Sequence, residues 1–185
     1  MEKQSAVFYL PLNKKPLFDI VEDPIPDLGK TLIANCDFPK GSAVVIYFGK
    51  IITTEENFLK YMSNPKEYIE KFASYIRATP DQSKNIDASE LIENPSSNPN
   101  LMGVLVNDIA KPKSTDLSDL KEYLTTEDQC NLIVSDFTRD YPVYFANRDI
   151  KKGEYLTIHY GLGYWLLQMG IEPQDISKLL KMCEQ

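Results

Sequence analysis

The chain has 185 residues, a length that suits one domain with a sizeable core. Its hydrophobic fraction of 43% and charged fraction of 25% are ordinary for a soluble globular protein, and no apolar run approaches the ~20 residues of a membrane helix. The formal net charge of −7 disfavours direct binding of nucleic acid and fits a basic protein partner attracted by electrostatic steering. The opening residues are too polar for a signal peptide, so we expect an intracellular protein.

Cysteine and histidine are too sparse for the common metal and nucleophile sites. Cys36, Cys130 and Cys183 are widely separated, and their odd number argues against a disulfide framework. A zinc site or a catalytic triad would have to use His159, the only histidine. Because His159 stands beside Tyr160 in an alternating stretch, we expect it to point outward from a strand rather than to act as a base.

The first half of the chain predicts short strands separated by turns. Residues 1–25 contain several prolines and predict strands and turns wrapped over the core. Further strands are expected at residues 31–34, 43–48 and 51–53, and the turn at residues 39–42 separates the first two.

The next part of the chain changes to helical spacing and then returns to strands. Residues 55–72 carry apolar side chains three or four positions apart, which predicts one or two short helices broken near Asn64 and Pro65. Residues 73–77 and 86–89 are typical of strands, and the composition of residues 94–100 predicts a loop.

The second half begins with an apolar run, residues 101–108, which predicts a buried strand and a turn. Residues 110–129 follow as a polar excursion with one short helix, which we expect at the surface beside the substrate face. A hairpin is predicted from residues 130–134 and 141–146, and a helix from Pro173.

The stretch before that helix ends on a tyrosine and a glycine. A polar turn, residues 151–154, is followed by alternation through residues 155–160 and a break at Gly161. A tyrosine delivered to a strand end is well placed to point its hydroxyl into a site. The same pattern also describes an edge strand with a core tyrosine, so the segment alone leaves both interpretations open.

Three ordered blocks together resemble the SET-domain protein lysine methyltransferases. Residues 149–161 resemble the closing signature of that family, in which the tyrosine before glycine is catalytic, and Tyr160 matches it. Residues 29–53 resemble the opening blocks, with Thr31 where the family has its second glycine. Residues 101–108 resemble the asparagine–histidine block, with Asn107 matching the asparagine and Asp108 replacing the histidine.

This resemblance implies a mostly β, α+β fold of small curved sheets with a knot-like C-terminal segment and a few short helices. It implies one SET domain over residues 1–185, with a core of about residues 22–165 and a helical segment at residues 166–185. The cysteine-rich zinc segment that often follows the domain is missing. A compact chain of this kind resembles bacterial or viral proteins that act on host or own proteins, in the cytoplasm or nucleus.

The implied activity is transfer of a methyl group from S-adenosylmethionine to a lysine of a basic protein or peptide, histones among them. Tyr160 would be catalytic, Tyr47 would form the wall of the lysine channel, and no metal is required. The residues expected to bind the cofactor are Gly29, Lys30, Thr31, Tyr75, Asn107, Asp108 and Trp165.

Two alternatives stay open. Tyr75 and Trp165 are equally well explained as core residues, Trp165 as the anchor of the C-terminal helix. The departures from the family pattern at Thr31, Asp108 and residues 110–129 allow a second function class, a degenerate SET module that binds a peptide or protein partner without catalysis.

Overall fold

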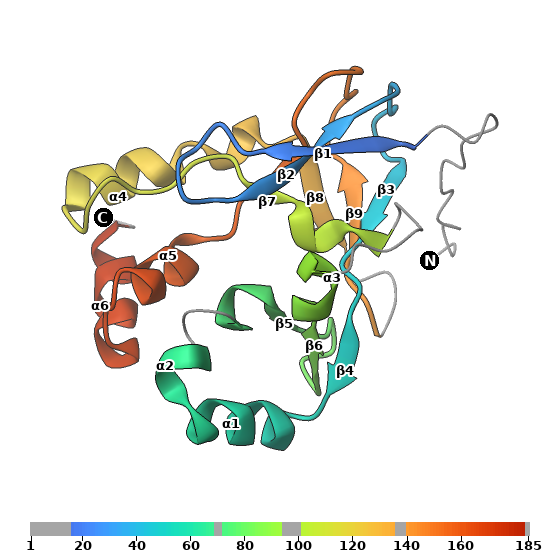
Figure 1. The fold of residues 1–185 in the computed structure, drawn as a ribbon. Helices are drawn as coiled ribbons and strands as arrows, with labels where there is room; N and C mark the ends of the chain where they lie inside the picture. Colours follow the sequence, from blue (N-terminus) through green and yellow to red (C-terminus); the bar gives the residue numbers. More distant parts are fainter. Residues whose placement is uncertain (1–15, 69–71, 94–100, 136–139, 184–185) are drawn as a thin grey trace, which may run out of the picture.

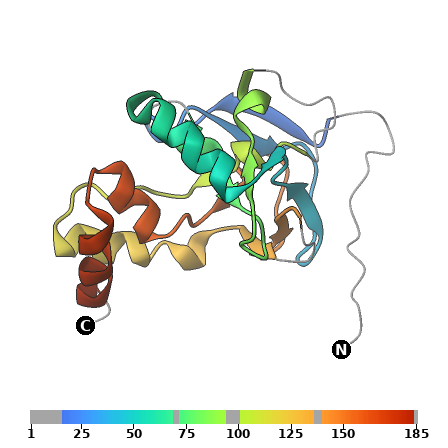
Figure 2. The same ribbon diagram turned by 90° about the horizontal axis from the view of Figure 1, so that it is seen from below.

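The computed structural model describes residues 16–68, 72–93, 101–135 and 140–183 (Figure 1). Small sheets occupy one side of the molecule and a group of helices the other, and both views show this division (Figures 1 and 2). No helix in the described ranges has the length and apolarity that crossing a membrane demands.

The strands are short and form four small sheets. Their bounds are β1 Phe18–Glu22, β2 Lys30–Ala34, β3 Ala43–Ile46, β4 Lys50–Ile52, β5 Ile76–Ala78, β6 Asn85–Asp87, β7 Asn107–Asp108, β8 Leu132–Ser135, β9 Val143–Ala146 and β10 Thr157–Ile158. Antiparallel pairing joins β1 to β2, orders one sheet as β3-β9-β8 and orders another as β4-β6-β5. The fourth sheet pairs β7 with β10 in parallel.

The helices lie below and beside these sheets. Their bounds are α1 Thr54–Ser63, α2 Pro65–Glu67, α3 Ser89–Glu93, α4 Leu117–Leu124, α5 Leu162–Gln168 and α6 Pro173–Cys183, with the 3-10 turns η2 Ala73–Tyr75, η4 Gly103–Leu105 and η5 Glu127–Gln129. The predicted break near Asn64 is confirmed. A capping box between Thr53 and Glu56 starts α1, and Asn64 caps α2 with Pro65 in its first turn.

The interior consists of two hydrophobic clusters. The larger one lies among the sheets, and its fully buried members include Phe38, Ile86 and Leu156. The smaller one joins the last helices to α4: Leu120 and Tyr123 of α4 pack with Trp165 and Leu166 of α5. The helical side of the molecule in Figures 1 and 2 therefore has a core of its own.

The prediction that residues 110–129 form a surface excursion holds for most of these residues but missed that one helix face is buried. The expected helix is present as α4, but Leu120 is 0% exposed and Tyr123 is 2% exposed. The apolar face of α4 is covered by α5 and α6. The sequence predicted a strand that ends at Tyr160 and did not predict the helix α5 that follows it. A helix face needs a partner surface, and the partner here lies some forty residues later in the chain.

Several strand predictions were too long. The predicted strand of residues 73–77 is the 3-10 turn η2 followed by β5, and residues 101–108 are buried mainly as η4. A Cβ at Gly103 would lie 2.6 Å from the backbone carbonyl of Ile46. The close contact of the two backbones requires glycine at position 103. This packing outweighs the strand propensity of residues 101–108, the middle of which therefore forms the 3-10 turn η4. The predicted loop at residues 94–100 and most of the hairpin turn lie outside the described residues.

Candidate active site

The parallel pair of β7 and β10 brings the closing tyrosine to the asparagine block. Asn107 is opposite Thr157, Asp108 is opposite Ile158, and the Ile109 N–H donates to the Ile158 carbonyl at 3.1 Å. The chain leaves this ladder directly after Ile158, and Gly161, with φ of 88°, turns it into α5. Tyr160 is therefore held between a two-residue strand and a helix.

The hydroxyl of Tyr160 is fixed by the asparagine block. It donates to the Val106 carbonyl at 2.9 Å and lies 3.4 Å from the Asn107 Oδ1. Burial, reinforced by the neighbouring Tyr144 and Tyr164 hydroxyls, raises the pKa of Tyr160 well above its usual value. The phenol consequently stays protonated at neutral pH and acts as a hydrogen-bonding group rather than as a base.

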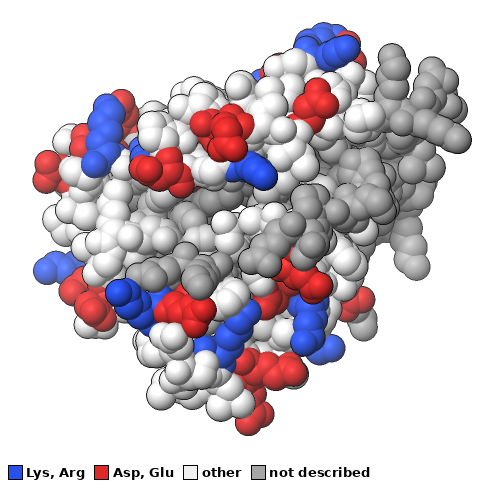
Figure 3. Space-filling model, in the orientation of Figure 1, with Lys and Arg blue, Asp and Glu red and all other residues white. Residues whose placement is uncertain are grey.

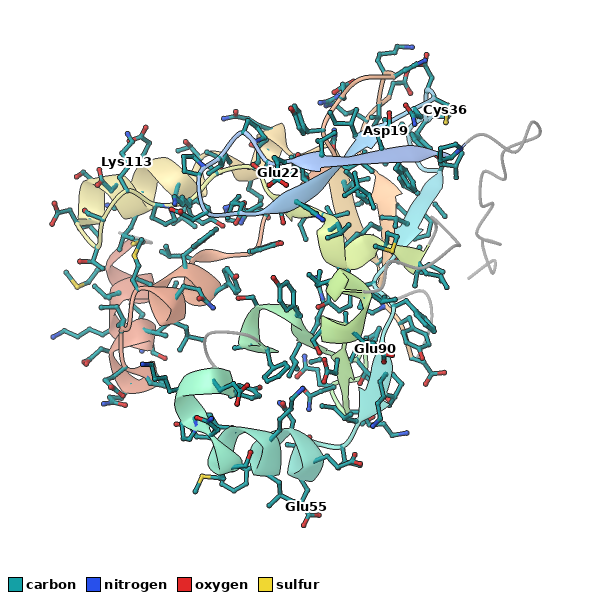
Figure 4. The ribbon with its side chains drawn as sticks, viewed as in Figure 1. Asp19, Glu22, Cys36, Glu55, Glu90 and Lys113 are labelled. Carbon is teal, nitrogen blue, oxygen red and sulfur yellow. The ribbon has the colours of Figure 1, made fainter. Side chains whose placement is uncertain are left out.

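Tyr160 lines a cavity of about 190 Å³ with three other tyrosines. Side chains of α5 and of the segment around β5 enter the space between these elements (Figure 4). Burial also raises the pKa of Tyr47 and of Tyr144, so their hydroxyls are neutral as well. The residues that line the cavity are Tyr47, Ser74, Ile76, Arg77, Val104, Val106, Tyr144, Ile158, His159, Tyr160 and Tyr164.

One permanent charge lines this cavity. The Arg77 guanidinium donates to the Tyr144 hydroxyl at 2.8 Å, and its central carbon lies 5.9 Å from the Tyr47 ring centroid. Within the described parts of the chain Arg77 has no carboxylate partner. The cavity thus combines aromatic walls, neutral hydroxyls and a positive charge.

Arg77, Tyr144 and Tyr164 line the cavity but were not predicted as site residues from the sequence. Tyr164 lies in α5 and its ring meets the Tyr160 ring edge-on, with 4.8 Å between centroids, but no helix was predicted there, so the spacing of the two tyrosines gave no signal. Arg77 and Tyr144 belong to different sheets and are 67 positions apart, so no local pattern connects them.

The Asn107 side chain braces the loop that carries Gly29. Its amide nitrogen donates to the Leu28 carbonyl at 3.2 Å, to the Lys30 carbonyl at 3.1 Å and to the Asp23 carboxylate at 2.9 Å. Gly29 has φ of 71°, and nothing lies within 4 Å of where its Cβ would be. The structure therefore brings Gly29, Lys30 and Asn107 together, and the outer side of the loop at Gly29 is open to a ligand.

Thr31 does not obstruct that loop, although it replaces a glycine of the family pattern. Its side chain is 0% exposed, and its Oγ1 has no hydrogen-bond partner among the described residues. Thr31 pairs with Val21 between β1 and β2, and its side chain is fully buried. The residues present at the loop thus fit the methionine end of S-adenosylmethionine, which a backbone at Gly29 can approach closely.

Asp108 and Trp165 are joined by a hydrogen bond, whereas Tyr75 packs against the main core. The indole N–H of Trp165 donates to the Asp108 carboxylate at 2.7 Å, and both side chains are buried in the second core region. Tyr75 is half-buried against the main core. The expected cofactor contacts of these three residues remain predictions.

The prediction that His159 points outward is wrong. Its ring stacks on Tyr123 of α4, with 4.3 Å between the ring centroids. The His159 Nε2 is buried and has no hydrogen-bond partner among the described residues. The reason is the unforeseen burial of α4, which covers the face of the closing strand that was expected to meet solvent.

The SET-domain family model matches residues 29–161 of this chain, which include the whole site described above. The chain belongs to the SET-domain family. This is a family of protein lysine methyltransferases that use S-adenosylmethionine, and the predicted fold class is thereby confirmed. No curated protein matches the chain.

Solved SET-domain structures share the fold at low sequence identity. A crystal structure of CpSET8 from Cryptosporidium is 21% identical, with a TM-score of 0.51 over 78% of this chain and 57% of that chain. The ctPRC2 structure, in an autoinhibited conformation bound to S-adenosylmethionine, is 16% identical, with a TM-score of 0.52 over 90% of this chain and 17% of that chain. A second PRC2 structure, from Chaetomium thermophilum, is 18% identical, with a TM-score of 0.51 over 78% of this chain and 15% of that chain.

This chain therefore spans only part of the length of these solved proteins. At such identities the structural similarity establishes the fold alone. The activity, the substrate and the partners of this chain do not follow from it.

Proposed function

We propose that the protein transfers a methyl group from S-adenosylmethionine to the amine of a lysine in a basic protein or peptide, histones among them. The observation that carries this proposal is the Tyr160 hydroxyl, which stands in the family's tyrosine–glycine position, is fixed by Val106, and lines a tyrosine-rich cavity. The cavity of about 190 Å³ is smaller than the roughly 300–1,000 Å³ of most small-molecule pockets. It suits a single long side chain.

The cofactor would lie against the loop that Asn107 braces. S-adenosylmethionine supplies an activated methyl group on a sulfonium when it is bound. Gly29 offers backbone to its methionine end, and Asn107 keeps that loop in place. Asp108 and Trp165 border the same block from the side of α5.

The chain's own residues favour a neutral lysine amine in the cavity. A lysine has a reference pKa of about 10.4 and must lose its proton before it can accept a methyl group. Desolvation by the tyrosine-lined walls and repulsion from the Arg77 guanidinium both disfavour the ammonium form. The protonated hydroxyl of Tyr160 then orients the amine by a hydrogen bond, and orientation is the chief requirement of an in-line transfer.

The preference for a basic partner is supported by the net charge of −7. On the face shown in Figure 3, charged side chains of both signs lie along the upper and lower parts, and the described residues between them are largely uncharged. Long-range electrostatic attraction by the negatively charged molecule would therefore increase the rate at which a basic substrate binds. The uncharged band would contact the neutral residues of that substrate.

The competing proposal, a module that binds without catalysis, draws on Thr31 and Asp108. Both departures are accommodated by the structure: Thr31 is fully buried and Asp108 accepts several hydrogen bonds. Neither of them removes the Tyr160 hydroxyl or closes the Gly29 loop.

The test is methyl transfer to a panel of basic peptides and histones, measured as a mass increase of about 14 Da per methyl group. Each peptide is paired with a control in which every lysine is replaced by arginine, which keeps the charge. Transfer confined to the lysine peptides is the expected result. Binding of S-adenosylmethionine without transfer to any peptide or protein of the panel would contradict the proposal and favour the binding module.

A further inference from the structure

A single buried carboxylate connects the helical side of the molecule to Tyr160. The Asp108 Oδ2 accepts from the Tyr123 hydroxyl at 2.6 Å, from the Trp165 indole N–H at 2.7 Å and from the Tyr160 backbone N–H at 3.1 Å. Asp108 is 1% exposed. The three donors come from α4, from α5 and from the segment between β10 and α5.

Neutral groups alone satisfy this carboxylate within the described residues, because no lysine or arginine there forms an ion pair with Asp108. A buried charge that depends on hydrogen bonds is sensitive to each of them, since the loss of one leaves part of its desolvation uncompensated. The three donors are therefore held in one mutual arrangement, and the backbone of Tyr160 is one of them.

Tyr160 is held at three places by the elements that this carboxylate joins. Its N–H is bound by Asp108, its hydroxyl by the Val106 carbonyl, and its ring packs against Trp165 with 6.3 Å between centroids. The preceding residue, His159, stacks on Tyr123 of α4. The helix α4 thus contacts the tyrosine's neighbour directly and the tyrosine itself through Asp108.

We propose that Asp108 is a positioning residue, which fixes Tyr160 for methyl transfer and makes α4 and α5 part of the active site. This inference rests on the proposed function and deepens it. The insertion that carries α4 then serves the reaction itself, because a displacement of Tyr160 by about 1 Å can lower a rate by about 100-fold.

The experiment compares the intact wild-type chain with Asp108→Asn and Tyr123→Phe. The asparagine keeps the size of the side chain but cannot reproduce three acceptor contacts at one uncharged oxygen. The phenylalanine removes one donor and keeps the ring that stacks on His159. Tyr155→Phe is the matched control, because it removes the hydroxyl of a 38% exposed tyrosine on the same closing segment.

Two readouts are taken for each variant: kcat with the KM of a lysine peptide, and hydrogen exchange of the Tyr160 backbone amide by NMR. We expect kcat to fall about 100-fold in Asp108→Asn and about tenfold in Tyr123→Phe, with KM within about twofold. The Tyr160 amide should exchange at least about tenfold faster in Asp108→Asn, while the Val45 amide of β3 keeps its rate. Tyr155→Phe should match wild type in both readouts.

An unchanged kcat in both variants would overturn the proposal. So would faster exchange at Tyr160 and Val45 alike, because that result describes general destabilisation. Should Asp108→Asn fail to fold, Tyr123→Phe decides between these outcomes. Absence of methyl transfer by the wild type would defeat the proposed function, whereas unchanged exchange at Tyr160 in the variants would defeat the positioning role of Asp108.

Discussion

Asn107 offers the most demanding test of how the cofactor loop is held. We consider Asn107→Ala, which removes the amide that donates to the Leu28 and Lys30 carbonyls and to the Asp23 carboxylate. The amide nitrogen has two hydrogens for three acceptors, so at most two donated hydrogen bonds are lost, and the 3.4 Å contact of the Asn107 Oδ1 with the Tyr160 hydroxyl is lost as well.

The magnitude follows from the partners. One neutral hydrogen bond contributes about 0.5–1.5 kcal/mol, and one to a charged group about 1.5–3 kcal/mol. Asp23 and Leu28 are half-exposed, so water can replace part of what is lost. We therefore expect the free energy of unfolding to fall by about 2 kcal/mol and the affinity for S-adenosylmethionine to fall about tenfold, or about 1.4 kcal/mol.

Denaturant unfolding and calorimetric titration with S-adenosylmethionine measure both quantities. Asn107→Asp provides a comparison of nearly equal shape, and it should be worse than alanine because a carboxylate would face Asp23 and two carbonyl oxygens. Asn35→Ala is the control, because its side chain has no hydrogen bond to another described residue. Unfolding and affinity both unchanged in Asn107→Ala would refute the bracing role.

Three further predictions concern the helical core, the buried tyrosines and Arg77. Leu120→Ala should lower the free energy of unfolding by about 2–5 kcal/mol, and an effect under about 1 kcal/mol in denaturant unfolding would place α4 outside the core. Burial raises the folded-state pKa of Tyr47 and of Tyr144, so their contribution to stability is complete below about pH 10 and is lost as the pH rises further. The free energy of unfolding should therefore fall as the pH rises above about 10, by up to about 1.4 kcal/mol per pH unit for each tyrosine, and the melting temperature should fall with it; a constant melting temperature would contradict their burial. Arg77→Gln should shift the rising limb of the pH–kcat profile upward by about one pH unit, because loss of like-charge repulsion raises the pKa of the bound lysine; an unshifted profile would exclude that role.

The features that local sequence predicts well are those set by neighbouring residues. The helix of residues 55–72 with its break near Pro65 and the β8–β9 hairpin depend on spacing within a few positions, and the structure contains both, whereas the capping box at Thr53 was not predicted because that residue was assigned to a strand. The family motifs likewise located Tyr160 beside Asn107, because each motif is a short segment with its own pattern.

The features that local sequence did not predict depend on distant partners. The polar composition around α4 indicated a surface helix, and only the three-dimensional packing of Leu120 against α5 and α6 buries it. The same packing turns His159 inward and makes Asp108 a junction of three donors. Arg77 lines the cavity because it donates a hydrogen bond to Tyr144 of another sheet, a contact that no local sequence pattern predicts.

The central claim is that the Tyr160 hydroxyl orients a lysine amine for methyl transfer, and removal of that one oxygen tests it most directly. Tyr160→Phe keeps the ring and its contacts with Tyr164 and Trp165, so fold and cofactor affinity should change little. The rate of methyl transfer to a lysine peptide should fall by about 100-fold or more, as when one positioned polar group is lost from a transition state, while Tyr155→Phe keeps most of the activity. Equal rates for Tyr160→Phe and an active wild type would contradict the account.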